Sequence, residues 1–277
     1  MRNLTNPAPA WEWAGSGEIH YITVPAWAGQ GVKVGFTARG GGASQPPYQS
    51  LNLGLHVGDE YDRVIANRQA LAAAFSSDLG HLVCCQQVHG HEVILLDADM
   101  VGRGSSVYDT ALEGYDAMIC HTPGLLLATF YADCFPVFFF DPVQRAVGLA
   151  HSGWKGVMGR IPAKTVAEMG QRFNSQPQDI QVLIGPGIQK CCFEIGPDLV
   201  DRVRQEFASL WNIIDINGKN YRWDLAETIR QTLYQCGITP EHMISCELCT
   251  SCHTELFFSY RKEGGETGRM AAVIGLE

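Results

Sequence analysis

The most apolar stretch of the chain, residues 125–140, carries Asp133 and Pro136 in its interior. The stretch is shorter than the ~20 residues that a helix needs to cross a bilayer, and an internal proline would break such a helix. Short apolar runs that end in polar residues are typical of strands buried in a core. Residues 125–140 therefore predict two buried strands joined by a polar break, and no membrane partner.

Hydrophobic periodicity predicts both strands and helices along the rest of the chain. The other expected strands are 19–21, 32–36, 82–88, 93–96, 117–120, 146–150, 182–184, 256–260 and 271–274. Helical spacing appears over 61–75, where Asp59 is expected to cap the helix and the Arg68 stem to lie along its apolar stripe. Helices are also expected over 197–207, opened by a proline, and after Asp224, whose cap is completed by Glu227. This mixed order predicts an α+β protein, a mixed α/β sandwich.

Composition narrows the class of protein further. No linker divides the sequence, so we expect a single domain over residues 1–277. A hydrophobic content of 46% supports a sizeable core, and a net charge of −9 argues against nucleic acid as a partner. The N-terminus shows no apolar signal region, so a cytoplasmic location is expected. In that reducing compartment most of the ten cysteines should be buried thiols, and packing is the interpretation for Cys84, Cys85, Cys120, Cys191, Cys192 and Cys236.

Three short polar stretches each follow an apolar run. They are Gln87-Val88-His89-Gly90, Ala132-Asp133-Cys134 and His151-Ser152-Gly153-Trp154-Lys155-Gly156. Neighbouring strand ends would bring together one histidine, one thiolate and a second histidine. Three protein ligands leave the fourth position of zinc open, as in catalytic zinc sites. The stretches match no compact zinc motif, but polar side chains at these points have little packing rationale, so His89, Cys134 and His151 are predicted metal ligands of an enzyme.

Further chemistry would need a proton carrier and a site for the substrate. Asp133, beside the cysteine ligand, is the first candidate for the proton carrier, with the orientation of a histidine as its alternative role. Lys155, in a glycine-rich turn, and Arg261 are candidates for holding an anion. Asn52 lies inside an otherwise apolar Leu-Asn-Leu and is a candidate for substrate binding, with turn capping as the alternative.

A second group of cysteines invites a different interpretation. The segment Cys249-Thr250-Ser251-Cys252-His253 matches the pattern of covalent haem attachment, and Cys246 extends it towards an iron–sulfur spacing. Haem attachment belongs to exported proteins, and the following residues offer no fourth cysteine for a cluster. We therefore expect neither haem nor iron here, we disfavour a structural zinc, and we assign Cys252 to packing.

Several further motifs occur together in one order. They are Ser50-Leu51-Asn52-Leu53-Gly54, His56-Val57-Gly58-Asp59, Asn67-Arg68, Gly185-Pro186-Gly187-Ile188, Glu194-Ile195-Gly196, Cys249-Thr250, Phe258-Ser259-Tyr260-Arg261 and Thr267-Gly268-Arg269. With the three polar stretches, they resemble the YfiH-like or laccase-domain family over nearly the whole chain. Members of this family have been called multicopper polyphenol oxidases and, more recently, purine nucleoside phosphorylases.

The resemblance implies that His89, Cys134 and His151 hold zinc. It also implies phosphorolysis of adenosine, inosine and methylthioadenosine, deamination of adenosine, and a fold similar to the catalytic domain of cytotoxic necrotizing factor. The implied partners are a small nucleoside and phosphate. The sequence makes no prediction of the oligomeric state.

Three alternative functions stay open. Cys134 could act as a nucleophile with His151 as its base, in a cysteine or zinc amidohydrolase that edits a peptidoglycan precursor. The protein could be a binding module that metal stabilises without catalysis. A copper-dependent polyphenol oxidase fits less well, because the chain has nine histidines and a single His-x-His pair, His89-Gly90-His91, where blue multicopper oxidases use four such pairs. Copper bound in the three-ligand site could still give weak oxidase activity.

Overall fold

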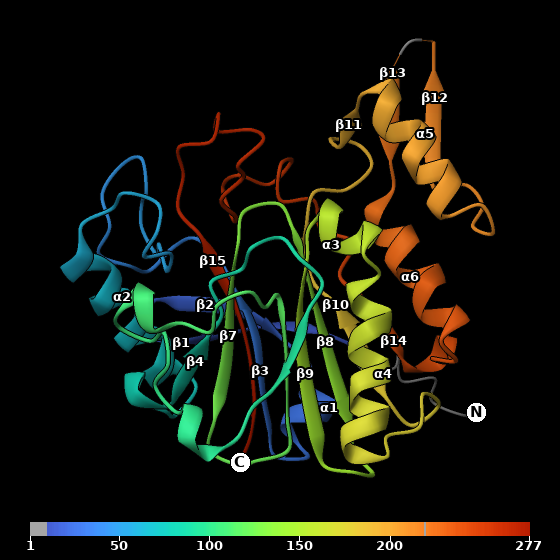
Figure 1. Ribbon diagram of the computed structural model, residues 1–277. Coiled ribbons are helices and arrows are strands. Elements are labelled where there is room, and N and C mark those ends of the chain that lie inside the picture. Colours follow the sequence, from blue (N-terminus) through green and yellow to red (C-terminus); the bar gives the residue numbers. More distant parts are fainter. Residues whose placement is uncertain (1–9, 219) are drawn as a thin grey trace, which may run out of the picture.

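The computed structural model describes residues 10–218 and 220–277, and its centre is a pair of six-stranded sheets (Figure 1). The first sheet has the order β1 (Glu12–Ser16), β2 (Ile19–Thr23), β3 (Val32–Thr37), β15 (Met270–Leu276), β7 (Leu126–Tyr131) and β4 (Leu82–Cys84). The second has the order β14 (Met243–Ser245), β10 (Gln181–Ile184), β8 (Phe135–Asp141), β9 (Ala146–Ser152), β6 (Ala117–Cys120) and β5 (Val93–Leu95).

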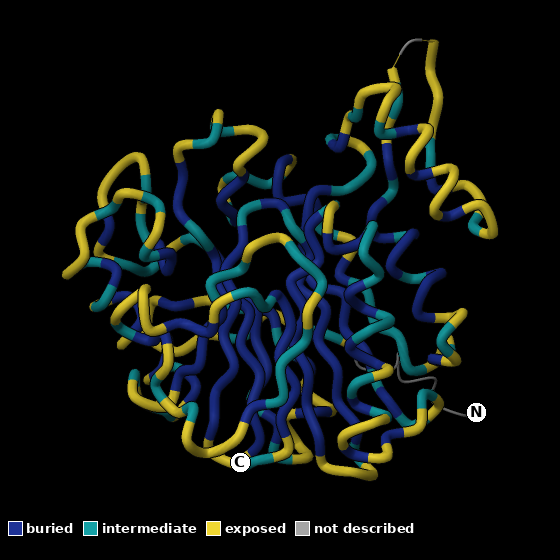
Figure 2. The backbone as a smooth tube through the Cα atoms, in the orientation of Figure 1, coloured by how far each residue is buried: buried dark blue, intermediate teal, exposed yellow. Residues whose placement is uncertain are grey.

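The sheets pack face to face, and helices cover their outer surfaces. One buried cluster joins Phe36 and Leu127 of the first sheet to Phe138 and Leu149 of the second. Figure 2 shows these strands as the most deeply buried part of the chain. The helix α2 (Tyr61–Ala74) packs on the first sheet, and α4 (Ile161–Phe173) and α6 (Leu225–Gln235) pack on the second. The prediction of a mixed α/β protein is confirmed.

The apolar run 125–140 connects the two sheets. It forms β7 in the first sheet and β8 in the second, joined by Ala132-Asp133-Cys134. All residues of both strands are buried, as the apolar pattern predicts. Because the chain passes from one sheet to the other at this break, Cys134 lies at the end of the sandwich between them.

A third, three-stranded sheet stands at one end of the sandwich (Figure 1). It contains β11 (Glu194–Ile195), β13 (Asn220–Trp223) and β12 (Ile214–Asn217), and α5 (Pro197–Glu206) accompanies it. The sequence predicts α5 but none of these strands, because they are short and mostly exposed. The remaining short helices are α1 (Pro25–Ala28), α3 (Trp154–Met158) and the 3₁₀ turns Leu79–His81, Ala98–Met100, Tyr108–Thr110 and Pro240–His242.

Several sequence predictions need correction. The expected strand 82–88 ends at Cys84, and residues 256–260 form turns without any strand. Asp59 is not the N-cap of α2: Glu60 takes that position, and the Asp59 carboxylate accepts from the Glu60 backbone N–H at 2.8 Å. The predicted cap of α6 is confirmed, because Asp224 Oδ1 accepts a 2.9 Å hydrogen bond from the Glu227 backbone N–H.

The Arg68 stem is predicted to lie along the apolar stripe of α2, and the structure adds hydrogen bonds from its guanidinium. The side chain is buried, and its guanidinium donates to the backbone carbonyls of Leu53, Gly104 and Ser105 at 2.7–2.8 Å. These bonds satisfy a buried charge and tie α2 to two loops.

Among the helices of the described residues, none has the length and apolar character of a membrane span.

Candidate metal centre and cavity

Three strand ends meet at one end of the two large sheets. His89 lies in the loop after β4, Cys134 lies between β7 and β8, and His151 lies near the end of β9. Their potential ligand atoms all lie within 4.8 Å of one another. His89 is exposed, Cys134 is half-buried and His151 is buried, so the group is accessible from one side only. The geometry thus brings together all three residues that the sequence selects.

Asp116, just before β6, bonds the imidazole of His151 and the backbone of the His89 loop. Its carboxylate is fully buried; Oδ1 accepts from His151 Nδ1 at 2.8 Å and from the His89 backbone N–H at 3.0 Å. Oδ2 accepts from the Gly90 backbone N–H at 2.6 Å. With Nδ1 of His151 bonded to Asp116, Nε2 is the nitrogen left for a metal, as is usual for histidine ligands held by a carboxylate. Sequence reasoning missed Asp116, because an aspartate before a strand carries no distinctive signal.

The side chains of the cluster shift each other's pKa values. Burial opposes ionisation of the Cys134 thiol, but the adjacent His151 and His89 outweigh it and lower the pKa of Cys134 to about 6. Burial likewise opposes protonation of His151, but the Cys134 thiolate and the Asp116 carboxylate raise the pKa of His151 to about 9. Without a metal, the pair is therefore a thiolate beside an imidazolium. A soft anionic ligand already in its deprotonated form is well suited to a metal cation.

The loops that carry the cluster adopt unusual backbone conformations. Gln87, His89 and Asp133 have φ values of +50°, +58° and +89°, in the left-handed region that costs non-glycine residues ~1–3 kcal/mol each. The Gln87 side chain holds its loop in place, since its amide donates to the Phe130 carbonyl at 2.9 Å and accepts from the Phe130 N–H at 2.7 Å. Strained residues that surrounding contacts fix in this way are characteristic of functional sites.

Gly153 leaves room for the cluster. A Cβ atom at this position would lie 2.8 Å from Cys134 Sγ and 3.2 Å from His89 Cδ2. The backbone φ of Gly153 is −71°, which any residue adopts, so the position needs glycine for space alone. The sequence placed this glycine in a turn but gave no sign of its contact with the ligands.

Gly153→Ala should therefore lower zinc affinity, because the new methyl group pushes Cys134 and His89 apart. We expect a loss of at least about tenfold, the lower end of the range for groups that support a metal ligand. Competition with a chromophoric chelator would measure it. Gly196→Ala is the matched control, since Gly196 has φ −79° and a Cβ there would have no atom within 4 Å. Equal affinities of the two variants would contradict this role.

The cluster opens into a cavity of about 540 Å³. Aromatic and aliphatic side chains from several loops line much of it, namely Tyr108, Phe130, Trp154, Ile188, Phe193, Leu225 and Tyr260. Arg261, Arg269 and His56 add polar groups to the same wall. Desolvation by the cavity walls, together with the charges of Arg269 and Arg68, lowers the pKa of His56 to about 4, so this imidazole is neutral at pH 7. The cavity volume suits a drug-sized or nucleoside-sized ligand.

The other predicted site residues have different surroundings. Asp133 lines the cavity, but its carboxylate accepts from Thr250 Oγ1 and from the Arg261 backbone N–H, both at 2.7 Å. These bonds hold the segment that carries Arg261, and neither joins Asp133 to a histidine, the alternative role predicted for it. Arg261 itself lines the cavity. Lys155 does not belong to the cavity lining, and its ammonium lies 5.7 Å from the centre of the Trp154 ring.

Asn52 is fully buried and is not among the residues that line the cavity. Its Oδ1 accepts from the backbone N–H groups of Gly54 and Arg269 at 3.0 and 2.9 Å, and its Nδ2 donates to Asp59 at 2.9 Å. This geometry favours the turn-capping alternative. Through the bond to Arg269 it also fixes one of the cationic residues of the cavity wall.

The fold and the site define a mixed α/β protein with a Cys/His cluster that is compatible with a metal ion. Residues 33–277 match the family described as multi-copper polyphenol oxidoreductase laccase, and the chain belongs to this family.

Named relatives agree with this assignment. The chain is 39% identical to purine nucleoside phosphorylase YlmD of Geobacillus stearothermophilus, over 88% of this chain and 90% of that protein. It is 37% identical to purine nucleoside phosphorylase YlmD of Bacillus subtilis, over 89% of each. The crystal structure of the hypothetical protein YfiH of Bacillus licheniformis superposes with a TM-score of 0.90 at 37% identity, covering 96% of this chain and 99% of that one. These relatives match most of the chain, in agreement with its membership of the family.

Proposed function

We propose that this protein is a zinc-dependent purine nucleoside phosphorylase that also deaminates adenosine slowly. The observation that carries the proposal is the cluster of His89, Cys134 and His151 at the wall of a cavity large enough for a nucleoside. The names of the relatives point to the same substrate class. Adenosine, inosine and methylthioadenosine are the proposed nucleosides, with phosphate as the second substrate.

The donor set fits zinc. Two imidazoles and a thiolate are ligands that zinc prefers, and three of them leave one position for a substrate atom or water. Gly153 supplies the space, and Asp116 bonds the His151 imidazole and the backbone of His89, so the residues present are arranged around a common point. When bound, zinc would polarise a substrate oxygen or lower the pKa of a bound water to ~7. Copper also accepts such ligands, and metal analysis of purified protein distinguishes the two.

The other residues of the cavity suit the two substrates. In phosphorolysis a phosphate oxygen forms a bond to C1′ of the ribose while the bond from C1′ to the purine nitrogen breaks, and the purine leaves with the electron pair and gains a proton. Aromatic walls such as Phe193 and Trp154 suit a planar purine. Arg261 and Arg269 provide the positive charge that phosphate needs, in a protein whose net charge is −9.

The proposal is tested by the products formed from adenosine. With phosphate, purified zinc-loaded protein should release adenine and ribose 1-phosphate. Without phosphate, it should yield inosine slowly. Chromatography of both reactions, with chelator-treated protein as the control, provides the measurement. If zinc-loaded protein formed neither product, the assignment to nucleosides would be wrong.

Arg261 and Lys155 are the two candidates for binding the phosphate anion, and substitution of each distinguishes them. Arg261→Gln should raise the KM for phosphate by about tenfold or more, because a charged hydrogen bond to the anion is lost. Slow deamination should change less, since it uses no phosphate. Arg172→Gln, on the exposed face of α4, is the control. A larger effect of Lys155→Ala than of Arg261→Gln would place the anion at the glycine-rich turn instead.

A second candidate function is supported by the charge state of Cys134. Its pKa is lowered to about 6, it lies beside His151, and Asp116 holds that histidine in turn. A thiolate, an adjacent imidazolium that holds the thiol proton and an orienting carboxylate are the parts of a cysteine hydrolase. We propose an amidohydrolase acting on a peptidoglycan precursor as this alternative. This alternative includes the proposal that the fold is similar to the catalytic domain of cytotoxic necrotizing factor, itself a cysteine hydrolase.

A further inference from the structure

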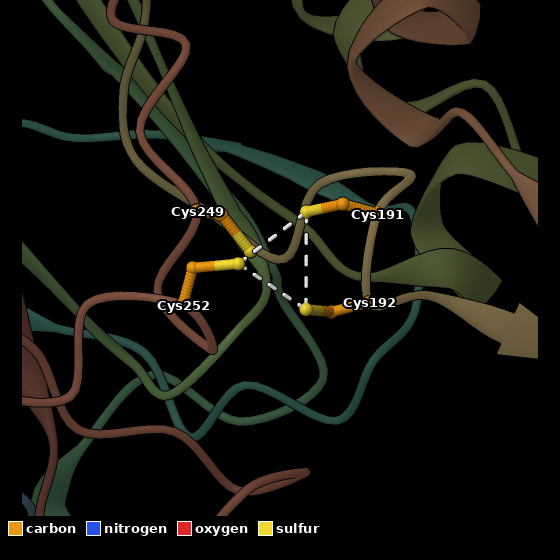
Figure 3. Close-up of side chains that lie close together, drawn as sticks. All are labelled: Cys191, Cys192, Cys249 and Cys252. Carbon is orange, nitrogen blue, oxygen red and sulfur yellow. Dashed lines mark hydrogen bonds between the residues drawn. The ribbon is translucent and has the colours of Figure 1, made fainter.

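Four cysteines that the proposed reaction does not use come together in space (Figure 3). Cys191 and Cys192 lie in the loop between β10 and β11, and Cys249 and Cys252 lie in the loop after β14. Their four Sγ atoms all lie within 4.8 Å of one another, and in Figure 3 the four side chains point toward a common centre. None of these residues belongs to the cluster of His89, Cys134 and His151.

Burial contradicts the packing role predicted for Cys191, Cys192 and Cys252, whereas Cys249, for which no packing role is predicted, is buried. Cys191 and Cys252 are exposed and Cys192 is only half-buried, whereas Cys84, Cys85 and Cys120 are buried as predicted. An exposed thiol gains little from hydrophobic contacts. Another reason is therefore needed for four sulfur atoms from two distant segments to converge.

The separations between the sulfur atoms fit a tetrahedral metal ion. Cys192 Sγ lies 3.8 Å from Cys191 Sγ and 3.4 Å from Cys252 Sγ, and Cys191 Sγ lies 3.5 Å from Cys252 Sγ. Four sulfur ligands of zinc at ~2.3 Å would lie ~3.8 Å apart at the corners of a tetrahedron. Only small movements would bring the four sulfurs to these positions.

Backbone hydrogen bonds connect the two loops that carry the four cysteines. Gly187 N–H donates to the Leu248 carbonyl, and Thr250 N–H donates to the Gly187 carbonyl, both at 3.2 Å. The Gln189 N–H donates to Cys249 Sγ at 3.4 Å. Hydrogen bonds from the backbone to a ligand sulfur stabilise its anionic form. These hydrogen bonds connect the two loops and hold their cysteines in register.

We propose that Cys191, Cys192, Cys249 and Cys252 form a second, structural zinc site. Four thiolates close the coordination sphere, which distinguishes structural zinc sites from catalytic ones. The C-x-x-C spacing of Cys249 and Cys252 is typical of such sites. A single disulfide between Cys192 and Cys252 would leave the other two thiols without a purpose, whereas a metal uses all four.

The location indicates what this zinc stabilises. The Cys191–Cys192 loop directly precedes β11, the first element of the small sheet with α5, and it lies between the cavity residues Ile188 and Phe193. Arg261 Nη1 donates to the carbonyls of Cys192 and Glu194 at 3.3 Å each. Zinc at the cluster would fix one wall of the cavity and the base of the small sheet.

The test measures zinc in protein that lacks the first site. The Cys134→Ala variant should retain one zinc per chain, and its X-ray absorption spectrum should show four sulfur neighbours at ~2.3 Å. Adding Cys191→Ser and Cys252→Ser in that background should remove one zinc equivalent. Adding Cys236→Ser instead should remove none, since Cys236 lies at the end of α6 away from the cluster. The readout is the loss of one equivalent on changing the cluster, so it does not depend on whether the proposed catalytic site binds zinc.

Three results would overturn the proposal. Cys134→Ala protein with four free thiols and no metal would do so, as would iron with visible absorption in place of zinc. A disulfide between Cys192 and Cys252, detected by mass spectrometry of alkylated protein without reduction, would do the same. The spectrum of the Cys134→Ala variant decides the matter even if the cluster variants fail to fold.

Discussion

Cys134→Ala is expected to abolish metal binding at the site of His89, Cys134 and His151 and to abolish turnover with it. A site with an open fourth position has no ligand to spare, because two histidines alone hold zinc weakly. The loss in kcat/KM should exceed about 100-fold, the upper end for residues that merely support a metal ligand. Zinc content of purified protein and release of adenine from adenosine and phosphate are the two measurements.

Cys236→Ser is the control for this variant. It also removes a thiol, but Cys236 belongs neither to the four-cysteine cluster nor to the cluster that contains Cys134. It should keep its full zinc content and activity. Zinc retained at the site in Cys134→Ala while turnover is lost would instead support Cys134 as a nucleophile. The measurement therefore separates the phosphorylase proposal from the amidohydrolase proposal.

The sequence predicts the fold well where one apolar pattern dominates. Residues 125–140 form two buried strands because nearly every side chain is apolar and the polar break at Asp133 marks the turn. The α6 cap at Asp224 is equally local, since donor and acceptor are three residues apart. The short strands β11–β13 escape prediction because their stability depends on one another and not on their own residues.

In the candidate site too, some residues can be predicted from local sequence and others cannot. His89, Cys134 and His151 stand out because each is polar at the end of an apolar run, which local sequence reveals. Asp116 and Gly153 support them through contacts between segments distant in sequence. The same limit explains the second cysteine cluster. Cys246 and His253 are the potential ligands near Cys249 and Cys252 in sequence, but the residues that join them in space, Cys191 and Cys192, come from another loop.

Asp116→Asn tests whether the carboxylate orients the metal ligands. The substitution keeps the shape of the side chain, but it removes the negative charge and replaces one acceptor oxygen with a donor nitrogen. The amide cannot accept all three hydrogen bonds that Asp116 now accepts from His151, His89 and Gly90. Zinc affinity should fall by about 10–100-fold, the usual cost of losing such a partner. Competition titration with a chelator measures it.

If Asp116 acts only by positioning the metal ligands, the kinetics of Asp116→Asn should show this. Because Asp116 contacts the histidines and does not line the cavity, excess zinc should restore much of the turnover of Asp116→Asn while the KM for nucleoside stays near the wild-type value. Asp62→Asn, an exposed change in the first turn of α2, should alter neither zinc affinity nor turnover. Unchanged zinc affinity in Asp116→Asn would show that the histidines are oriented without this carboxylate. Turnover that excess zinc fails to restore, in a folded and zinc-loaded variant, would give Asp116 a direct part in the reaction instead.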